Sequence, residues 1–202
     1  MIVAIVPAAG LSHRMGRPKP LLDLGDGPLI ARVVAAIREG GVSRVVVVAP
    51  PADRAESAAI ASAAESAGAE VVVPAVQPSD MRASIEAGLA RFEGFPSPRS
   101  ILIAPTDIPG ITGGLVNRLI EESRRHPRAI VVPIADGKRG HPAILPWSVA
   151  LAIRGLPAGV GVKSLFDGAG SVLVEMPVDD RASFLDLDTP DDYRVWTGRD
   201  LS

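Results

Sequence analysis

Short runs of apolar residues alternate along the chain with longer segments in which apolar and polar residues are mixed. Ile2–Val6 is apolar throughout, and Arg44–Ala49 contains four consecutive valines. Such continuous runs are typical of strands that are buried on both faces of a parallel sheet. Between them, Leu29–Arg38 is predicted to be a helix, and Gly40 and Gly41 follow at the position where glycine ends helices. The first three elements are therefore predicted to be a strand, a helix and a strand.

The same alternation continues along most of the chain. Alternating strands and helices form a sheet with helices on both faces, so the sequence predicts an α/β protein, a three-layer α/β/α sandwich with a mostly parallel sheet. A length of 202 residues fits a single domain, residues 1–202, and we see no segment with the length and polarity of an interdomain linker. The other predicted strands are Glu70–Val73, Ile101–Ala104, Ala129–Pro133, Ala143–Leu145 and Ser171–Glu175, and the other predicted helices are Asp53–Ala67, Asp80–Phe92, Thr112–Arg125, Val162–Phe166 and Pro190–Trp196.

Composition narrows the classes of function. A net charge of −2 argues against general binding of nucleic acids or anionic membranes. The absence of cysteine removes disulfides, thiolate metal sites and cysteine nucleophiles, and it fits the reducing cytoplasm. Met1–Val6 leads directly into a predicted strand, so we expect no signal peptide, and no uncharged apolar run has the length of a membrane span. We expect a cytoplasmic protein that binds neither nucleic acid nor membrane.

The loop after the first predicted strand is the first candidate for a ligand site, because such sheets bind ligands at the carboxyl ends of their strands. Its small residues let the backbone approach a ligand closely, and successive backbone amides can form a nest for an anion. Arg14 and Lys19 add positive charges that suit phosphate groups. The candidate ligand-binding residues of this loop are Ala8, Ala9, Gly10, Ser12, Arg14 and Lys19.

The spacing of the loop excludes two common phosphate-binding motifs. A dinucleotide-binding loop needs Gly-x-Gly-x-x-Gly, whereas this loop has only Gly10 and Gly16. A P-loop places Lys directly after its second Gly, whereas Gly16 is followed by Arg17 and Pro18. From composition alone, an ordinary strand-to-helix connection with surface cations remains the alternative.

Two further segments carry carboxylates after predicted strands. Asp107 ends an apolar strand, where a hard oxygen ligand is well placed for Mg²⁺; a cap for the helix that starts near Thr112 is the alternative. Asp186 and Asp188 alternate with leucines, so both point to one face of an extended segment. Asp188 is also a candidate cap for the last predicted helix, whose first position is Pro190. No such role in a helix explains Asp186.

These segments resemble the MobA-like NTP transferases. The signature of that family, Leu-Ala-Ala-Gly-x-Ser-x-Arg-Met-Gly-x-x-Lys, matches from Ala8 to Lys19, with Pro7 in place of the usual Leu. The resemblance extends from Ala4 to Tyr193 and implies a nucleotidyltransferase domain with a fold like that of type A glycosyltransferases. It further implies a catalytic Mg²⁺ held by Asp107 and Asp186, with Asp188 as the competitor for the second position, and catalytic roles for Arg14, Lys19 and Asp107.

One element points to a branch of the family. Gly140-His141-Pro142 resembles the Gly-His-Pro element of the molybdenum cofactor cytidylyltransferases. It implies that CMP passes from CTP to the terminal phosphate of a molybdopterin-type acceptor, with release of pyrophosphate. The resemblance also adds Ser84 and His141 to the ligand-binding residues. Near Ser84, the residues Gln77, Asp80 and Arg82 depart from the pattern of the family, in a region where base or acceptor recognition lies.

Several alternatives remain open at this stage. Within the same class, the donor could be GTP, or the acceptor another phosphorylated metabolite. A non-catalytic cofactor-binding chaperone is disfavoured by the intact Arg14, Lys19, Asp107 and Asp186. A nicotinamide-dependent oxidoreductase is disfavoured by the missing Gly-x-Gly-x-x-Gly. As a further partner we expect a transient contact with a molybdoenzyme, or its chaperone, that receives the product.

Overall fold

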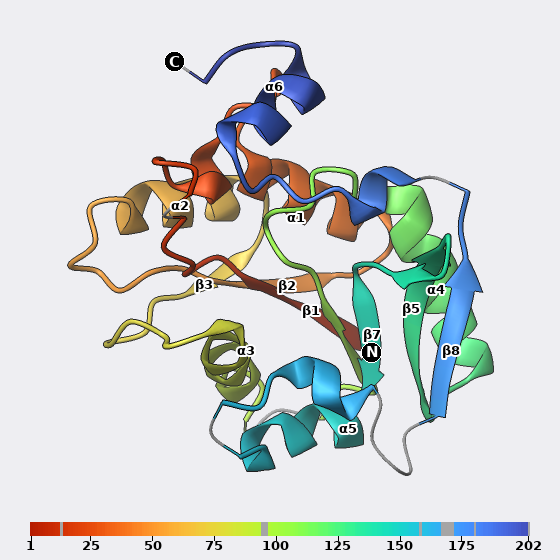
Figure 1. The fold of residues 1–202 in the computed structure, drawn as a ribbon. Coiled ribbons are helices and arrows are strands. Elements are labelled where there is room, and N and C mark those ends of the chain that lie inside the picture. Colours follow the sequence, from red (N-terminus) through yellow and green to blue (C-terminus); the bar gives the residue numbers. More distant parts are fainter. Residues whose placement is uncertain (13, 94–96, 158, 167–171, 180, 202) are drawn as a thin grey trace.

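The computed structural model describes residues 1–12, 14–93, 97–157, 159–166, 172–179 and 181–201. Its centre is one sheet of eight strands in the order β3-β2-β1-β4-β7-β5-β6, with β8 paired to β5 (Figure 1). The apolar runs that predicted strands lie in this sheet. Its strands are β1 (Ile2–Pro7), β2 (Arg44–Val48), β3 (Glu70–Val72), β4 (Ser100–Ile103), β5 (Ala129–Ala135), β6 (Lys138–Arg139), β7 (Ala143–Pro146) and β8 (Val172–Pro177).

Most strand pairs are parallel, as predicted. β1 runs parallel to β2 and β4, β2 to β3, and β5 to β8. The exceptions are β7, which pairs antiparallel with both β4 and β5, and the short β6, which pairs antiparallel with β5. The order also contains a switch point: the chain passes from β1 to β2 and β3 on one side, and then returns to place β4 on the other side of β1. Ligands bind beside such switch points in open α/β sheets.

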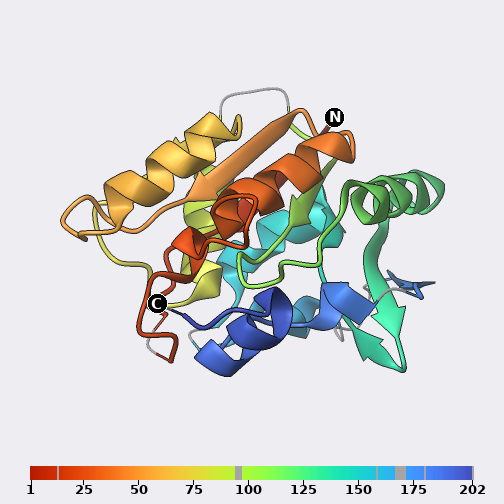
Figure 2. The same ribbon diagram turned by 90° about the horizontal axis from the view of Figure 1, so that it is seen from above.

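Helices cover both faces of the sheet. Figures 1 and 2 show α1, α2 and α4 over one face, and α3 and α5 over the other. Because successive side chains of a strand point to opposite faces, Val3 and Ile5 pack in one apolar core and Ala4 and Val6 in the other. The three-layer prediction is confirmed. The helices are α1 (Leu29–Glu39), α2 (Ser57–Ser66), α3 (Met81–Ala90), α4 (Gly113–Arg125), α5 (Trp147–Ala152) and α6 (Pro190–Thr197).

Some predicted boundaries were wrong. The second helix begins only at Ser57, because residues 53–56 form turns after Pro50 and Pro51. The predicted helix Val162–Phe166 is a single 3-10 turn, Val162–Leu165. The predicted strand Ser171–Glu175 corresponds to β8, and its first residue lies outside the described residues.

One helix was missed altogether. Helix α5 follows β7 without a break, spans six residues and has no side chain that caps its first turn. A helix this short carries too little periodicity to be recognised from sequence. In the described part of the chain, no helix is long and apolar enough to cross a membrane.

Candidate active site

A cavity of about 410 Å³ opens beside the switch point. Its walls come from the loop after β1, the loop after β4, and the segment that leads into α3. Residues that are far apart in sequence therefore meet at the carboxyl ends of neighbouring parallel strands. Of the residues predicted from sequence, the cavity is lined by Ala8, Ala9, Gly10, Ser12, Arg14, Lys19, Ser84 and Asp107.

The backbone of the loop is open toward this cavity. Within the described residues, the amides of Ala9, Gly10 and Leu11 donate to no protein acceptor. A Cβ added at Gly10 would meet no heavy atom within 4 Å, so the packing of the protein itself does not require glycine there. The Ser12 hydroxyl accepts a hydrogen bond from the Lys19 amide at 3.0 Å and closes the loop. Unpaired amides beside open space form a suitable cradle for an anion.

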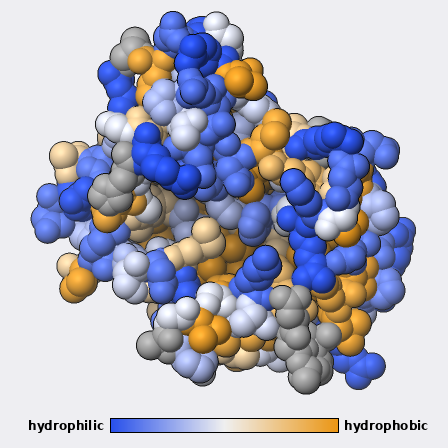
Figure 3. All heavy atoms as spheres, in the orientation of Figure 1, coloured by the Kyte–Doolittle hydropathy of each residue, from blue (hydrophilic) through white to orange (hydrophobic). Residues whose placement is uncertain are grey.

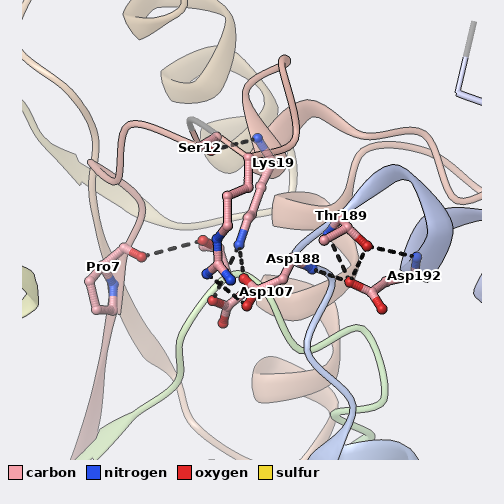
Figure 4. Close-up of polar contacts among 9 residues, drawn as sticks. Pro7, Ser12, Lys19, Asp107, Asp188, Thr189 and Asp192 are labelled. Carbon is pink, nitrogen blue, oxygen red and sulfur yellow. Dashed lines mark hydrogen bonds and ion pairs between the residues drawn. The ribbon is translucent and has the colours of Figure 1, made fainter.

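Both cations of the loop pair with carboxylates, and Figure 4 shows the Lys19 side chain pointing to Asp107 and Asp188. The Lys19 ammonium lies 3.8 Å from Asp107 and hydrogen-bonds to Asp188. Arg14 lies 2.8 Å from the second oxygen of Asp188. The Lys19 side chain is only 13% exposed, whereas that of Arg14 is 69% exposed, so Lys19 forms the less hydrated contact. The hydrogen bond from Lys19, followed by the charges of Lys19 and Arg14, holds the pKa of Asp188 below its usual value.

Asp188 does not cap the last helix, which corrects the alternative role predicted for it. Thr189 is the N-cap of α6: its hydroxyl accepts from the Asp192 amide, and the Asp192 carboxylate accepts from the Thr189 amide. This reciprocal pair satisfies the first turn without the Asp188 side chain. Asp107 does not cap α4 either, because Thr112 accepts from the Leu115 amide, as predicted.

Close backbone contacts bring the C-terminal carboxylates to this place. A Cβ at Gly110 would lie 2.2 Å from the backbone of Ala182, and a Cβ at Gly140 would lie 2.5 Å from the Phe184 ring. The Leu187 amide donates to the Asp107 carbonyl at 2.7 Å. Only glycine permits so close an approach at the two contact points. The segment before α6 therefore lies against the loops after β4 and before β7.

The ionisation of Asp186 is affected by its partial burial and by the neighbouring carboxylates. Burial raises the pKa of Asp186, and the negative charges of Asp107 and Asp188 raise it further. In the described residues there is no group of three or more His, Cys, Asp or Glu side chains arranged to hold a metal ion. Mg²⁺ needs no such group, because it commonly binds one or two carboxylates together with phosphate oxygens and water. The hard oxygens of Asp107 and Asp186, two carboxylates that repel each other, fit such an ion.

His141 lines a second cavity of about 1070 Å³. The two cavities adjoin, since Asp80 and Met81 line both. Burial lowers the pKa of His141, and the charge of Asp107 partly opposes this shift. Its Nδ1 is buried without a hydrogen-bond partner in the described structure. His141 therefore lines the second cavity within electrostatic reach of Asp107, which lines the first.

The second cavity combines an apolar wall with a cationic rim. Figure 3 shows hydrophobic side chains in the hollowed centre of this face with hydrophilic ones around them. Arg82 and Arg139 on the rim are paired with Glu86 and Glu175. Lys138 and Lys163 form no ion pair within the described residues. The apolar wall includes Ile85, Ile103, Ile134, Ala143, Val162 and Phe166.

These two lysines were missed as site residues. The chain contains only three lysines, Lys19, Lys138 and Lys163, and each of them lines one of the two cavities. Lysine is rare in this chain whereas arginine is common, and this imbalance could have marked each lysine as a candidate site residue. Gln77, which departs from the family pattern, lines the first cavity and donates to the Ala9 carbonyl at 2.7 Å, so it supports the loop.

Comparison with known sequences gives the family. A model of the MobA-like NTP transferase domain matches residues 4–173. A 2-C-methyl-D-erythritol 4-phosphate cytidylyltransferase of Nocardia farcinica is 32% identical over 139 residues, 67% of this chain and 57% of that protein, so the chain spans little more than half of it. A molybdenum cofactor guanylyltransferase of Xanthomonas euvesicatoria is 27% identical over 193 residues, 94% of this chain and 90% of that protein.

Solved structures agree. The crystal structure of Rv0371c from Mycobacterium tuberculosis has a TM-score of 0.80 and 26% identity, with 98% of each chain covered. A second structure of that protein, in complex with manganese, has a TM-score of 0.78 and 25% identity, again over 98% of each chain. The predicted fold is therefore confirmed, and the chain belongs to the MobA-like NTP transferases, a family of nucleotidyltransferases.

Proposed function

We propose that the protein is a Mg²⁺-dependent cytidylyltransferase that moves CMP from CTP to the terminal phosphate of a molybdopterin-type acceptor. The observation that carries this proposal is that two unlike cavities adjoin at Asp80 and Met81, with Asp107 lining the first and His141 the second. One has unpaired amides and two cations, as a triphosphate requires. The other has an apolar wall and a lysine rim, which suit a flat ring system that carries anionic groups.

The reaction needs no protein base. An oxygen of the acceptor phosphate, already ionised at neutral pH, attacks the α-phosphorus of CTP, and the bond to the leaving pyrophosphate breaks. Arg14 and Lys19 hold the triphosphate and stabilise the charge on the leaving pyrophosphate. Asp107 and Asp186 are the residues that would hold Mg²⁺, which supplies positive charge between phosphates that otherwise repel each other. Catalysis then consists mainly of positioning and charge neutralisation.

The ligand-binding roles follow the two cavities. Ala8, Ala9, Gly10 and Ser12 form the cradle for the phosphates, and Ser84 lines the same cavity. His141 lines the second cavity, where burial lowers its pKa and favours the neutral imidazole, and its ring N–H can donate one hydrogen bond to the acceptor phosphate.

CTP is the proposed donor because of two sequence elements. Ala8-Ala9-Gly10 and Gly140-His141-Pro142 resemble the cytidylyl branch, whereas the guanylyl branch usually has Gly-Gly in its loop. GTP remains the second candidate, since the Xanthomonas guanylyltransferase matches 94% of this chain.

Pyrophosphate release from CTP, GTP, ATP and UTP, each with Mg²⁺ and a molybdopterin-type acceptor, tests both parts of the proposal. We expect the highest kcat/KM with CTP, and a matching rise in unfolding temperature when CTP and Mg²⁺ are added without acceptor. A higher kcat/KM with GTP would overturn the donor assignment alone. Acceptor binding without turnover of any triphosphate would instead indicate a cofactor-binding chaperone.

A further inference from the structure

The carboxylate of Asp188 pairs with both of the cations that are expected to hold the triphosphate, Arg14 and Lys19. Lys19 hydrogen-bonds to one oxygen of Asp188 (Figure 4). Arg14 lies 2.8 Å from the other oxygen. A carboxylate held in this way by Lys and Arg makes the contacts that a phosphate group would make. In the absence of a ligand, Asp188 therefore stands in for a phosphate at the wall of the first cavity.

The helix does not need the Asp188 side chain. Thr189 and Asp192 complete the cap of α6 between them, and Asp188 contributes only its backbone amide, which donates to Asp192 at 3.1 Å. Its carboxylate is 29% exposed and can leave the two cations without breaking the cap. The ion pair is thus a displaceable contact.

The charges around it determine what can displace it. Among the described residues, Asp107, Asp186 and Asp188 bring three carboxylates to the two cations, Arg14 and Lys19, and Asp192 adds a further negative charge nearby. A triphosphate that takes over both cations leaves three carboxylates uncompensated beside its own charge. A divalent cation that arrives with the triphosphate removes this repulsion, whereas a metal-free triphosphate does not.

We propose that Asp188 is a specificity-determining residue, which makes the site select metal-bound over metal-free triphosphate by competing for Arg14 and Lys19. This inference rests on the proposed role of the loop in triphosphate binding. The opposing reading is that Asp188 permanently positions Lys19 for the ligand. The two roles predict opposite signs, because removal of a competitor strengthens metal-free binding and removal of a positioning group weakens it.

The test is the Kd of CTP measured by calorimetry on the full chain, with EDTA and with excess Mg²⁺. We expect Asp188→Asn to bind metal-free CTP about tenfold or more tightly than the original protein, since one charge-assisted contact no longer competes. The Kd of CTP with Mg²⁺ should change much less. The ratio of the Kd measured with EDTA to the Kd measured with Mg²⁺ should therefore fall in Asp188→Asn. Asp191→Asn is the matched control: it removes the same charge three residues further along the chain, where Asp191 pairs with Arg194 and, among the described residues, with neither loop cation.

The outcomes separate the possibilities. Weaker or unchanged metal-free binding by Asp188→Asn, with an unfolding temperature like that of the control, would overturn the inference. Asp188→Ala, which leaves no amide to bind Lys19, should shift the Kd in the same direction, and a shift in the opposite direction would also overturn it. If the unsubstituted protein binds no CTP even with Mg²⁺, the triphosphate role of the loop fails, and the inference fails with it.

Discussion

At the scale of single residues, the loop cations differ in their surroundings, and this difference makes them separable by mutation. Lys19 is largely enclosed between two carboxylates, whereas most of Arg14 is in contact with solvent. A charge-assisted hydrogen bond contributes about 1.5–3 kcal/mol, and solvent weakens it at exposed positions. The enclosed cation should therefore contribute more to phosphate binding.

We predict that Lys19→Met raises the Kd of Mg²⁺-bound CTP about tenfold or more, and that Arg14→Met raises it less. Calorimetric titration measures both values. Arg17→Met is the control, because Arg17 lies in the same loop with the same charge but lines a different cavity. Equal Kd values for all three variants and the unsubstituted protein would exclude the loop as the triphosphate site.

The carboxylates give a second residue-scale prediction. Asp107→Asn keeps the shape of the side chain but removes its charge, so kcat should fall by about a hundredfold or more while the fold is retained. Asp186→Asn should have the milder effect, because Asp186 is repelled by the charges of Asp107 and Asp188, so the loss of its own charge relieves repulsion while its amide oxygen can still act as a hard ligand. Steady-state kinetics at saturating CTP and Mg²⁺, with circular dichroism as the check on folding, measures this. A full kcat in Asp107→Asn would contradict the assignment.

The residue scale also shows where sequence reasoning stops. The loop residues and Asp107 were predicted to lie together, and the structure brings them to one cavity. The pairing of Asp188 with Lys19 was not foreseen, because these residues are 169 positions apart and local sequence offered Asp188 a plausible helix cap. Local patterns predict local roles, and an ion pair between distant segments depends on topology.

At the scale of elements, hydrophobic patterning was sufficient for the long helices and the buried strands. It gave no direction for β7, because an apolar run of four residues is the same in parallel and antiparallel pairing. The return of the chain through the short β6 pair decides that direction. The predicted cap of α6, Asp188, is one residue before the observed cap, Thr189. Both are good capping residues, and only the backbone geometry selects Thr189.

This correction can be tested at the same scale. We predict that Thr189→Ala lowers the free energy of unfolding by about 1 kcal/mol, the usual loss for a capping side chain. Asp188→Ala should not produce a capping loss, because the Asp188 carboxylate accepts no bond from the backbone of the helix. Alanine is used because asparagine would itself be a good cap. Urea denaturation of both variants measures the difference. A loss of about 1 kcal/mol in Asp188→Ala together with no loss in Thr189→Ala would restore Asp188 as the cap.

At the scale of the whole molecule, the sheet order explains why two cavities adjoin. The loops after β1 and β4 leave neighbouring strands at the switch point and form the first cavity. The chain returns through β6 and β7, and this return places Lys138 and His141 beside the first cavity, over the face of the sheet that α3 covers. Lys19 thus lines the first cavity, and Lys138 and Lys163 line the second. Replacing one lysine at a time can therefore show which cavity binds which of the two substrates.

We therefore predict that Lys138→Ala and Lys163→Ala each raise the KM for the acceptor by up to about fivefold and leave the KM for CTP nearly unchanged. Both lysines lie on the exposed rim, where a single ionic contact contributes roughly 1 kcal/mol or less, so the double variant should show the clearer effect. Initial rates with each substrate varied in turn give the two KM values.

Lys138→Arg should retain most of the affinity, because it keeps the charge, and Arg128→Ala is the control for loss of an exposed cation that lines neither cavity. A rise in the KM for CTP of the same size as that for the acceptor would mean that the second cavity does not hold the acceptor alone, and the division of the site into two substrate pockets would have to be abandoned.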